Sequence, residues 1–262
     1  MKKNIILCLV FCLTLVFIEN NSFPQERKKL AQTGFKFLSV TTDARISGMG
    51  EAITSVKGNS TALLYNPAVM SSFDGLCDVS FGNTNWIADI NYIYGTLALS
   101  PFNGDYGVFG LSLVAVDYGV FNGTIVAPID DGFIDVGGYE PKAYSIGFGY
   151  AKSLSQKFSV GGQIKYVKQS LGNNILGIDE SGNPVISKYE EDAFAVDFGI
   201  LYHTGFKSLD FAMSVRNFST DRKYINENFE LPLTFKMGIS MNVFDLTSID
   251  KNSHSFFKKN YI

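Results

Sequence analysis

The sequence has few of the residues that form disulfides and metal sites, with 3 Cys, 2 His and 1 Trp among 262 residues. Cys8 and Cys12 fall in the first apolar stretch, which leaves Cys77 alone in the remainder of the chain. One cysteine cannot form an internal disulfide, so a small secreted fold held by disulfides is excluded. His203 and His254 have no Cys or His at ligand spacing, and we therefore expect no metal site and no cofactor.

Three further absences concern membrane helices, basic charge and catalytic motifs. After its first residues the chain has no apolar run long enough for a transmembrane helix, so a membrane span would have to consist of strands. The formal net charge of -3 argues against a nucleic-acid partner. Gly48-Met49-Gly50 lacks the third glycine of a dinucleotide-binding turn, and the acidic clusters at 130–131 and 190–192 are more typical of solvated loops than of calcium sites. We predict that the protein is not an enzyme.

The start of the chain has the pattern of an export signal. Lys2 and Lys3 precede an uncharged apolar run over residues 5–18, which is closed by polar residues. This run is too short to cross a bilayer as a helix and has the length of a signal-peptide core. We predict a signal peptide over residues 1–24 and an exported protein.

Glycine and aromatic residues are abundant, with 25 Gly, 23 Phe and 13 Tyr, and much of the chain alternates apolar with small or polar residues. At 194–203 and 233–243 the alternation lasts about nine to eleven residues, the length that a transmembrane strand needs. Weaker or shorter versions bring the total to about eight strands between residues 76 and 244. These segments are 76–84, 87–100 with a phase change at Gly95 that suggests a bulge, 106–117, 144–150, 158–166 and 209–216.

The charged residues of these segments all fall on the face that is not apolar. Lys165, Asp197, Arg216 and Lys236 would point into the lumen of a barrel, where they could line a passage or, as we favour, form ion pairs. A soluble β-sandwich is the alternative, since its strands also alternate. Its strands are usually about five or six residues long and its polar face is well charged, whereas here the second face carries mainly Gly, Ser and Ala. We therefore predict an all-β fold, a transmembrane antiparallel β-barrel.

The connections alternate in length, as they do in outer-membrane barrels, which have short periplasmic turns and long extracellular loops. This pattern places the N-terminal end of the first strand in the periplasm. The short connections centre on 103–104, 155–156 and 205–206, and the long ones cover 118–141, 171–188 and 219–230.

Residues 25–75 differ from the strands because they are rich in small residues. Asn59 or Ser60 is a plausible N-cap for a short helix through Leu64, and Asn66-Pro67 should end it, because a residue before proline is disfavoured in helical geometry. A compact, capped element of this kind is suited to packing inside a larger structure. We expect residues 25–75 to form a small hatch, or plug, that contains a short helix.

This hatch contains two motifs. The first is Ala44-Arg45, Gly48-Met49-Gly50 and Ala52, and the second is Ser60, Ala62 and Tyr65-Asn66-Pro67-Ala68. Together they resemble the start of the PorV/PorQ family, a branch of the FadL-like outer-membrane proteins. The resemblance implies that the segment lies in the barrel lumen, that Gly48, Gly50 and residues 65–68 are structural or gate a ligand, and that the barrel has about fourteen strands. About eight strands enclose only their own side chains and leave no room for a plug.

Residues 245–262 lack an amphipathic last strand, and we expect an irregular tail outside the family pattern and a chain that is truncated at its C-terminal end. The resemblance implies a type IX secretion component in the outer membrane of a Gram-negative bacterium, which binds or shuttles exported proteins. Its expected partners are outer-membrane lipid, exported proteins and other secretion components. The alternatives are a passive FadL-like transporter of hydrophobic small molecules and a structural surface barrel.

Overall fold

The computed structural model describes residues 33–126, 132–178, 184–220, 222–224 and 227–245. All of them belong to the second of two compact units, which covers Thr33–Ile262. The predicted signal peptide and most of the predicted tail lie outside the described residues.

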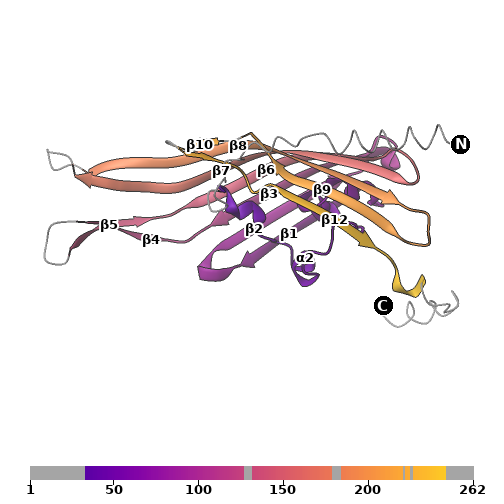
Figure 1. Cartoon of the computed structure of the whole chain (residues 1–262), viewed down its shortest axis with the longest axis horizontal. Coiled ribbons are helices and arrows are strands. Elements are labelled where there is room, and N and C mark those ends of the chain that lie inside the picture. The colour runs from indigo at the N-terminus through magenta and orange to yellow at the C-terminus, as the bar shows by residue number, and fades with distance from the viewer. Residues whose placement is uncertain (1–32, 127–131, 179–183, 221, 225–226, 246–262) are drawn as a thin grey trace, which may run out of the picture. The chain divides into compact units, whose positions relative to one another are not determined.

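One antiparallel sheet of 8 strands makes up most of the unit, in the order β1-β2-β3-β6-β7-β8-β9-β12 (Figure 1). Each strand pairs with its neighbours in the chain or with the next long strand, so the sheet is an up-and-down meander. The predicted number of strands is confirmed. The strands are β1 (Cys77–Asn85), β2 (Asn91–Leu99), β3 (Val108–Asp117), β6 (Lys142–Ser153), β7 (Phe158–Ile178), β8 (Pro184–His203), β9 (Asp210–Phe218) and β12 (Thr234–Ser240).

The sheet is open in the described part of the chain, with β1 and β12 at its two edges and no pairing between them. The all-β class is therefore confirmed, whereas a closed barrel is not seen. Among the described residues, no helix is long and apolar enough to cross a membrane.

The outer face of the sheet carries an unbroken row of apolar side chains that crosses seven strands. Strand register places Val79 beside Leu97, and continues the row from one strand to the next as far as Phe218. Phe148 is 55 % exposed and Ile164 60 % exposed, so no other part of the described chain covers this face. The full row is Val79, Leu97, Leu111, Phe148, Ile164, Val196 and Phe218.

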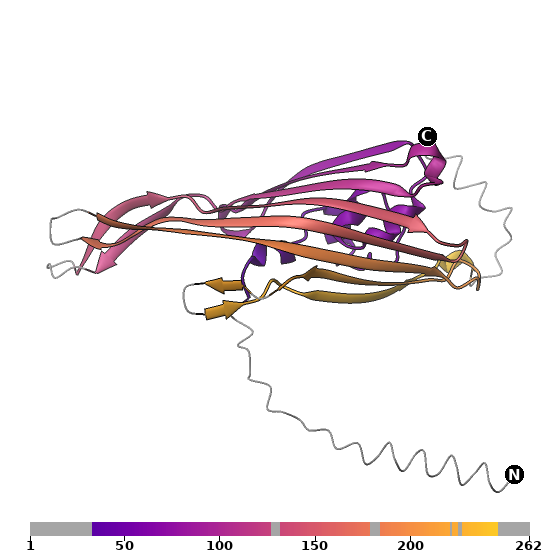
Figure 2. The ribbon, with the colours of Figure 1, turned by 90° about the horizontal axis from the view of Figure 1, so that it is seen from above.

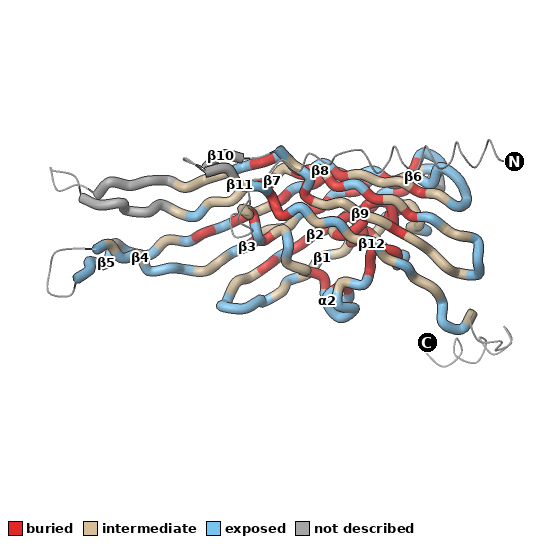
Figure 3. The backbone as a smooth tube through the Cα atoms, viewed as in Figure 1, coloured by how far each residue is buried: buried red, intermediate tan, exposed pale blue. Residues whose placement is uncertain are grey.

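The inner face is covered by the N-terminal segment, defined here as residues 33–75 (Figure 2). Its last helical turn contacts β6, β7 and β8, and buried positions gather in the part of the sheet beneath it (Figure 3). The short helix that was expected from Asn59 exists as a 3-10 helix, and Asn66-Pro67 ends it and begins the next one. The segment contains η2 (Lys36–Ser39), α2 (Ala44–Gly48), η3 (Ser60–Leu64) and η4 (Pro67–Ser72).

The predicted bulge at Gly95 is wrong. The pairing of β2 with β1 and with β3 runs through Gly95 without a shift. The apparent change of phase arises because Tyr92 and Tyr94 point inward, where they are buried against the N-terminal segment, while Ile93 faces outward.

The three long connections were predicted to be loops. In the structure they form β-hairpins or extensions of strands. β4 (Phe121–Val126) pairs with β5 (Phe133–Tyr139), β10 (Arg222–Tyr224) pairs with β11 (Glu227–Phe229), and β7 and β8 pair far beyond the rest of the sheet. β4 is exposed or half-buried at every position, so it has no buried face to produce a strict alternation of residue types. The short connections do occur where they were predicted, at the opposite end of the strands (Figure 1).

Candidate functional site

The Asn66-Pro67-Ala68 turn is fastened to the sheet through the side chain of Asn66, which is fully buried. Its Oδ1 accepts a hydrogen bond from the backbone N–H of Ala68 at 3.1 Å and so caps η4. Its Nδ2 donates to the carbonyl oxygens of Thr54 at 2.8 Å and Ile200 at 3.4 Å. One amide thus joins two parts of the N-terminal segment to strand β8.

Glycines in the sheet provide the surface on which this turn lies. Gly161 of β7 and Gly199 of β8 are directly paired. A Cβ on Gly161 would stand 2.5 Å from the backbone nitrogen of Ala68, and one on Gly199 would stand 1.9 Å from Asn66 Oδ1. No real Cβ fits at such distances, so the two glycines let the turn approach the strands directly.

A second glycine pair receives the side chain of Leu63. Gly110 of β3 and Gly149 of β6 are paired, and a Cβ on either would lie within 2.5 Å of a Leu63 methyl carbon. Leu63 itself is fully buried. The small residues of the inner face are thus explained by the close approach of the N-terminal segment.

The other motif residues of the segment differ in how closely they pack. Tyr65 is buried, and desolvation raises the pKa of its phenol to about 12. Its hydroxyl is buried without a hydrogen-bond partner, and the absence of a side chain at Gly58 leaves room for it. Gly48 and Gly50 lie in open space, with a positive φ of 57° at Gly50. The structure therefore brings the residues from Tyr65 to Ala68 onto the sheet, but not these two glycines.

A cavity of about 60 Å³ lies between the N-terminal segment and the inner face of the sheet. Its lining includes Lys165, Asp197, Arg216 and Lys236, the charged residues that were expected to face a lumen. They come from four strands, β7, β8, β9 and β12. That this inner face lines a closed barrel lumen stays a prediction.

Lys165 and Asp197 form a buried ion pair on one side of the cavity. Lys165 Nζ lies 2.8 Å from Asp197 Oδ2, and the two side chains are 10 % and 2 % exposed. Lys165 also donates to Asn217 Oδ1 at 2.6 Å, and the backbone N–H of Asn217 donates to Asp197 Oδ1 at 2.7 Å. The burial of two charges is costly, and these additional hydrogen bonds offset part of the cost.

A second ion pair joins the N-terminal segment to the edge strand β12. Lys236 Nζ donates to Glu51 Oε2, and Thr41 donates to Glu51 Oε1. The hydrogen bond from Lys236, followed by that from Thr41, holds the pKa of the Glu51 carboxyl below its usual value. This contact is partly exposed, unlike the pair at Lys165.

Arg216 lies in the same cavity without a carboxylate partner. It donates from Nη1 to the backbone carbonyl oxygen of Leu64 at 2.5 Å, and its buried Nε has no hydrogen-bond partner. Among the described residues it makes no ion pair. It is the one charged group of the network that is held only by a neutral acceptor.

Three polar residues of the site were missed at the level of sequence. Asp43 accepts from the Ile46 N–H at 2.9 Å and from the Tyr94 hydroxyl at 2.9 Å, so it caps α2 and ties it to β2. With its amide nitrogen turned toward the Leu63 carbonyl, Gln163 donates to that oxygen at 2.9 Å. Asn217 forms hydrogen bonds with both Lys165 and Asp197. Gln163 shares the inward phase of Lys165 along β7, which is the signal that could have identified it.

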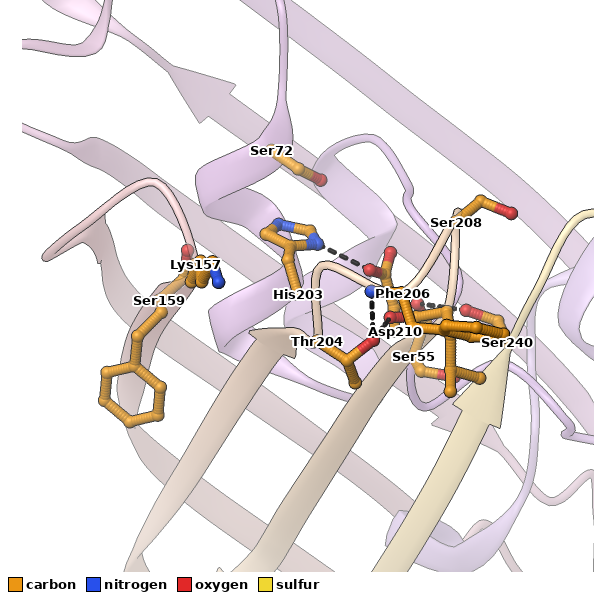
Figure 4. Close-up of polar contacts among 12 residues, drawn as sticks. Ser55, Ser72, Lys157, Ser159, His203, Thr204, Phe206, Ser208, Asp210 and Ser240 are labelled. Atoms are coloured by element: carbon orange, nitrogen blue, oxygen red, sulfur yellow. Dashed lines mark hydrogen bonds and ion pairs between the residues drawn. The ribbon is translucent and has the colours of Figure 1, made fainter.

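A separate polar cluster lies at the turn between β8 and β9 (Figure 4). His203 Nδ1 is 2.6 Å from Asp210 Oδ1 across the two strands. The hydroxyl of Ser72, which is drawn in the same view, donates to the Val69 carbonyl oxygen at 2.7 Å. The contacts at His203 join two strands and their turn. No group of three or more potential metal ligands occurs in the described parts of the chain.

Residues 136–260 match the family model of the type IX secretion system membrane protein PorP/SprF. No curated protein matches the chain. The matched region contains β6, β7, β8, β9 and β12, and with them all four charged cavity residues that were predicted from the sequence. It also includes most of residues 245–262, which were expected to lie outside the family pattern. The similarity is to a type IX secretion family other than PorV/PorQ.

Proposed function

We propose that the protein is an outer-membrane component of a type IX secretion system whose sheet forms part of a barrel wall and whose N-terminal segment is the hatch. The observation that carries the proposal is the match of residues 136–260 to a type IX secretion membrane protein family. The N-terminal motifs support the same system through their resemblance to PorV/PorQ proteins. The two similarities concern different parts of the chain and agree on the system.

The outer face supports a location in the membrane. On β8, the outward positions from Phe194 to Tyr202 are all apolar, and the next outward residue, Asp192, is charged. On β7 the apolar positions run from Phe158 to Tyr166 and are followed by Lys168. An apolar band bounded by aromatic residues, with charges beyond it, is the pattern of a transmembrane barrel wall.

Aromatic residues gather at both limits of this band. At one limit Tyr166 lies between the rings of Tyr144 and Phe194, with centroid separations of 6.3 and 5.4 Å. At the other, the rings of Phe109 and Tyr150 are 5.1 Å apart. Such belts position a protein at the two interfaces of a bilayer because the rings prefer the headgroup level.

We further propose that the protein acts by binding exported proteins or secretion components and has no enzymatic activity. The β4–β5 hairpin supports this, because it leaves Phe121 and Phe133 44 % and 51 % exposed at the end of the sheet away from the short turns. Exposed aromatic side chains are typical anchors of protein interfaces. The alternative, uptake of hydrophobic molecules, has less support at the cavity beneath the N-terminal segment, because charged residues from four strands line that cavity.

Deletion of the gene tests the proposal. We expect type IX cargo to accumulate in the periplasm, and wild-type complementation to restore its release. Complementation with a chain in which a two-residue turn replaces residues 119–140 should restore the amount of barrel in the outer membrane but not the release of cargo. Normal cargo release in the deletion strain would refute the secretion role, whereas full rescue by the shortened chain would refute only the role of the hairpin.

A further inference from the structure

We infer that the cavity beneath the N-terminal segment is a binding site for a small monovalent carboxylate, with the guanidinium of Arg216 as its principal ligand. The inference does not depend on the proposed role in secretion. Binding of a carboxylate can be measured on the purified chain, whatever the chain does in the cell. It follows from the partners of Arg216, the charges around it and the size of the cavity.

The hydrogen bonds of Arg216 leave part of its guanidinium available. One Nη donates to the Leu64 carbonyl at 2.5 Å, while Nε is buried without a partner. A buried donor that lacks an acceptor has lost its hydration without gaining a hydrogen bond, and the cost is greater when the group is charged. A carboxylate that accepts from Nε and the second Nη would remove that cost through the bidentate geometry that arginine favours.

The charges near Arg216 favour an anion. Lys165 is paired with Asp197 and Lys236 with Glu51, so these four groups balance one another. Arg216 interacts electrostatically with Asp197 and Glu51, but both carboxylates are already held by a lysine. Among these five groups, Arg216 is therefore the one without an ionic partner of its own.

Asp43 also borders the cavity but does not supply the missing charge at Arg216. Its Oδ1 accepts from the first turn of α2, and its Oδ2 accepts from the Tyr94 hydroxyl. Its negative charge is thus directed to a helix start and a phenol, and it forms no ion pair with Arg216. A ligand carboxylate would give Arg216 the ionic partner that no described residue provides.

The size of the cavity limits the ligand to a few heavy atoms. Its volume is about 60 Å³, whereas an engineered cavity that holds benzene has a volume of roughly 150 Å³. Formate or acetate fits this limit, and Thr42 and Ser145 provide hydroxyl groups along the same lining. A long acyl chain or a peptide could not be enclosed.

Binding can be measured on the full chain, purified in detergent, with sodium acetate as the probe. The thermal midpoint is followed as acetate replaces sodium sulfate at constant ionic strength. We expect a saturable rise for the wild type and for Arg45→Gln, which is the same substitution at an exposed arginine that does not line the cavity. We expect no saturable rise for Arg216→Gln. A wild type without a saturable response, or a variant with an unchanged one, would overturn the inference.

A second variant covers the possibility that Arg216→Gln does not fold. Arg216→Lys keeps the charge but loses the planar fork, and we expect its acetate dissociation constant to rise at least about tenfold, since lysine is a poor substitute at a bidentate site. Broadening of the ¹³C-acetate carboxyl resonance by the protein gives the same constant without heating. Equal acetate affinity in the wild type and in Arg216→Lys would show that the guanidinium is not the ligand.

Discussion

At Gly161 the backbone of a strand meets the backbone of the N-terminal segment, with no side chain between them. Glycine is needed at residue 161 for lack of space and not for its backbone conformation. Gly161 has an ordinary strand conformation, but a Cβ there would collide with Pro67 and Ala68. Its paired residue, Gly199, meets Asn66 in the same way. At the scale of single residues, the site is therefore defined as much by absent side chains as by charged ones.

Gly161→Ala should loosen the N-terminal segment. The added methyl group forces a backbone shift, and we expect a loss of about 1–3 kcal/mol in the free energy of unfolding. Urea unfolding of protein folded in vesicles measures the change, and trypsin cleavage at Lys57 reports whether the segment has left the sheet. The control is the neighbouring Gly162→Ala, which faces outward and meets nothing closer than 3.5 Å. Equal effects at the two positions would argue against close docking of the segment.

Among the elements, the N-terminal segment and the edge strand β12 depend on each other. Glu51 and Lys236 join them, together with a hydrogen bond from Ser240 to the Ser55 carbonyl at 3.0 Å and the close approach of Thr54 to Gly238. These partners are about 185 residues apart in the chain. The contact therefore closes a long loop of chain around the cavity.

The contribution of Glu51 should depend on pH. Because its pKa in the folded protein is lower than the usual value of 4.5, folding favours the ionised carboxylate. The stabilisation is complete above the unfolded pKa and is lost as the pH falls through the folded one. We expect wild type to unfold at higher urea concentration than Glu51→Gln at pH 7, and the difference to vanish in strong acid. Glu140→Gln, at an exposed carboxylate paired with Lys142, is the control. A difference that persists in strong acid, where the carboxyl is protonated in the folded and the unfolded protein, would contradict this role of Glu51.

Much of this element structure could be predicted from the sequence, and the failures have physical causes. Alternation identified the strands with one covered face, and the capping residues located the break at Asn66-Pro67. Alternation missed the β4–β5 hairpin, which has no buried face, and misread β2, where Tyr92 and Tyr94 turn inward. The four charged cavity residues could be assigned to a face, but their partners could not, because pairing across strands and with the N-terminal segment depends on register and not on local pattern.

At the scale of the whole molecule, lysine substitutions on the outer face of the sheet can test whether the protein inserts into a membrane. Phe158 and Ile164 both point outward on β7, but Phe158 is at one limit of the apolar band and Ile164 is inside it. A lysine at the middle of a bilayer costs about 2–4 kcal/mol, whereas one near the interface costs about 0–1 kcal/mol. The two positions therefore separate a lipid-facing surface from one that faces water.

We expect Ile164→Lys to reduce the fraction of protein that folds into phosphatidylcholine vesicles and to lower its urea midpoint, and Phe158→Lys to change both much less. Folding yield is measured by protection from protease and by the mobility of unheated samples on gels. A face that meets water would tolerate both lysines alike, and equal behaviour of the two variants would refute the membrane location.

The length of β7 has a further consequence for where the protein can act. The strand has 21 residues, which at about 3.3 Å per residue is roughly 70 Å of extended chain. A tilted strand needs only about 9–11 residues to cross the hydrocarbon layer. About half of β7, with its partner β8, is therefore available to rise above the lipid headgroups in the proposed orientation. A protein partner bound to this extension would therefore be held clear of the lipid headgroups and would not need to touch the bilayer.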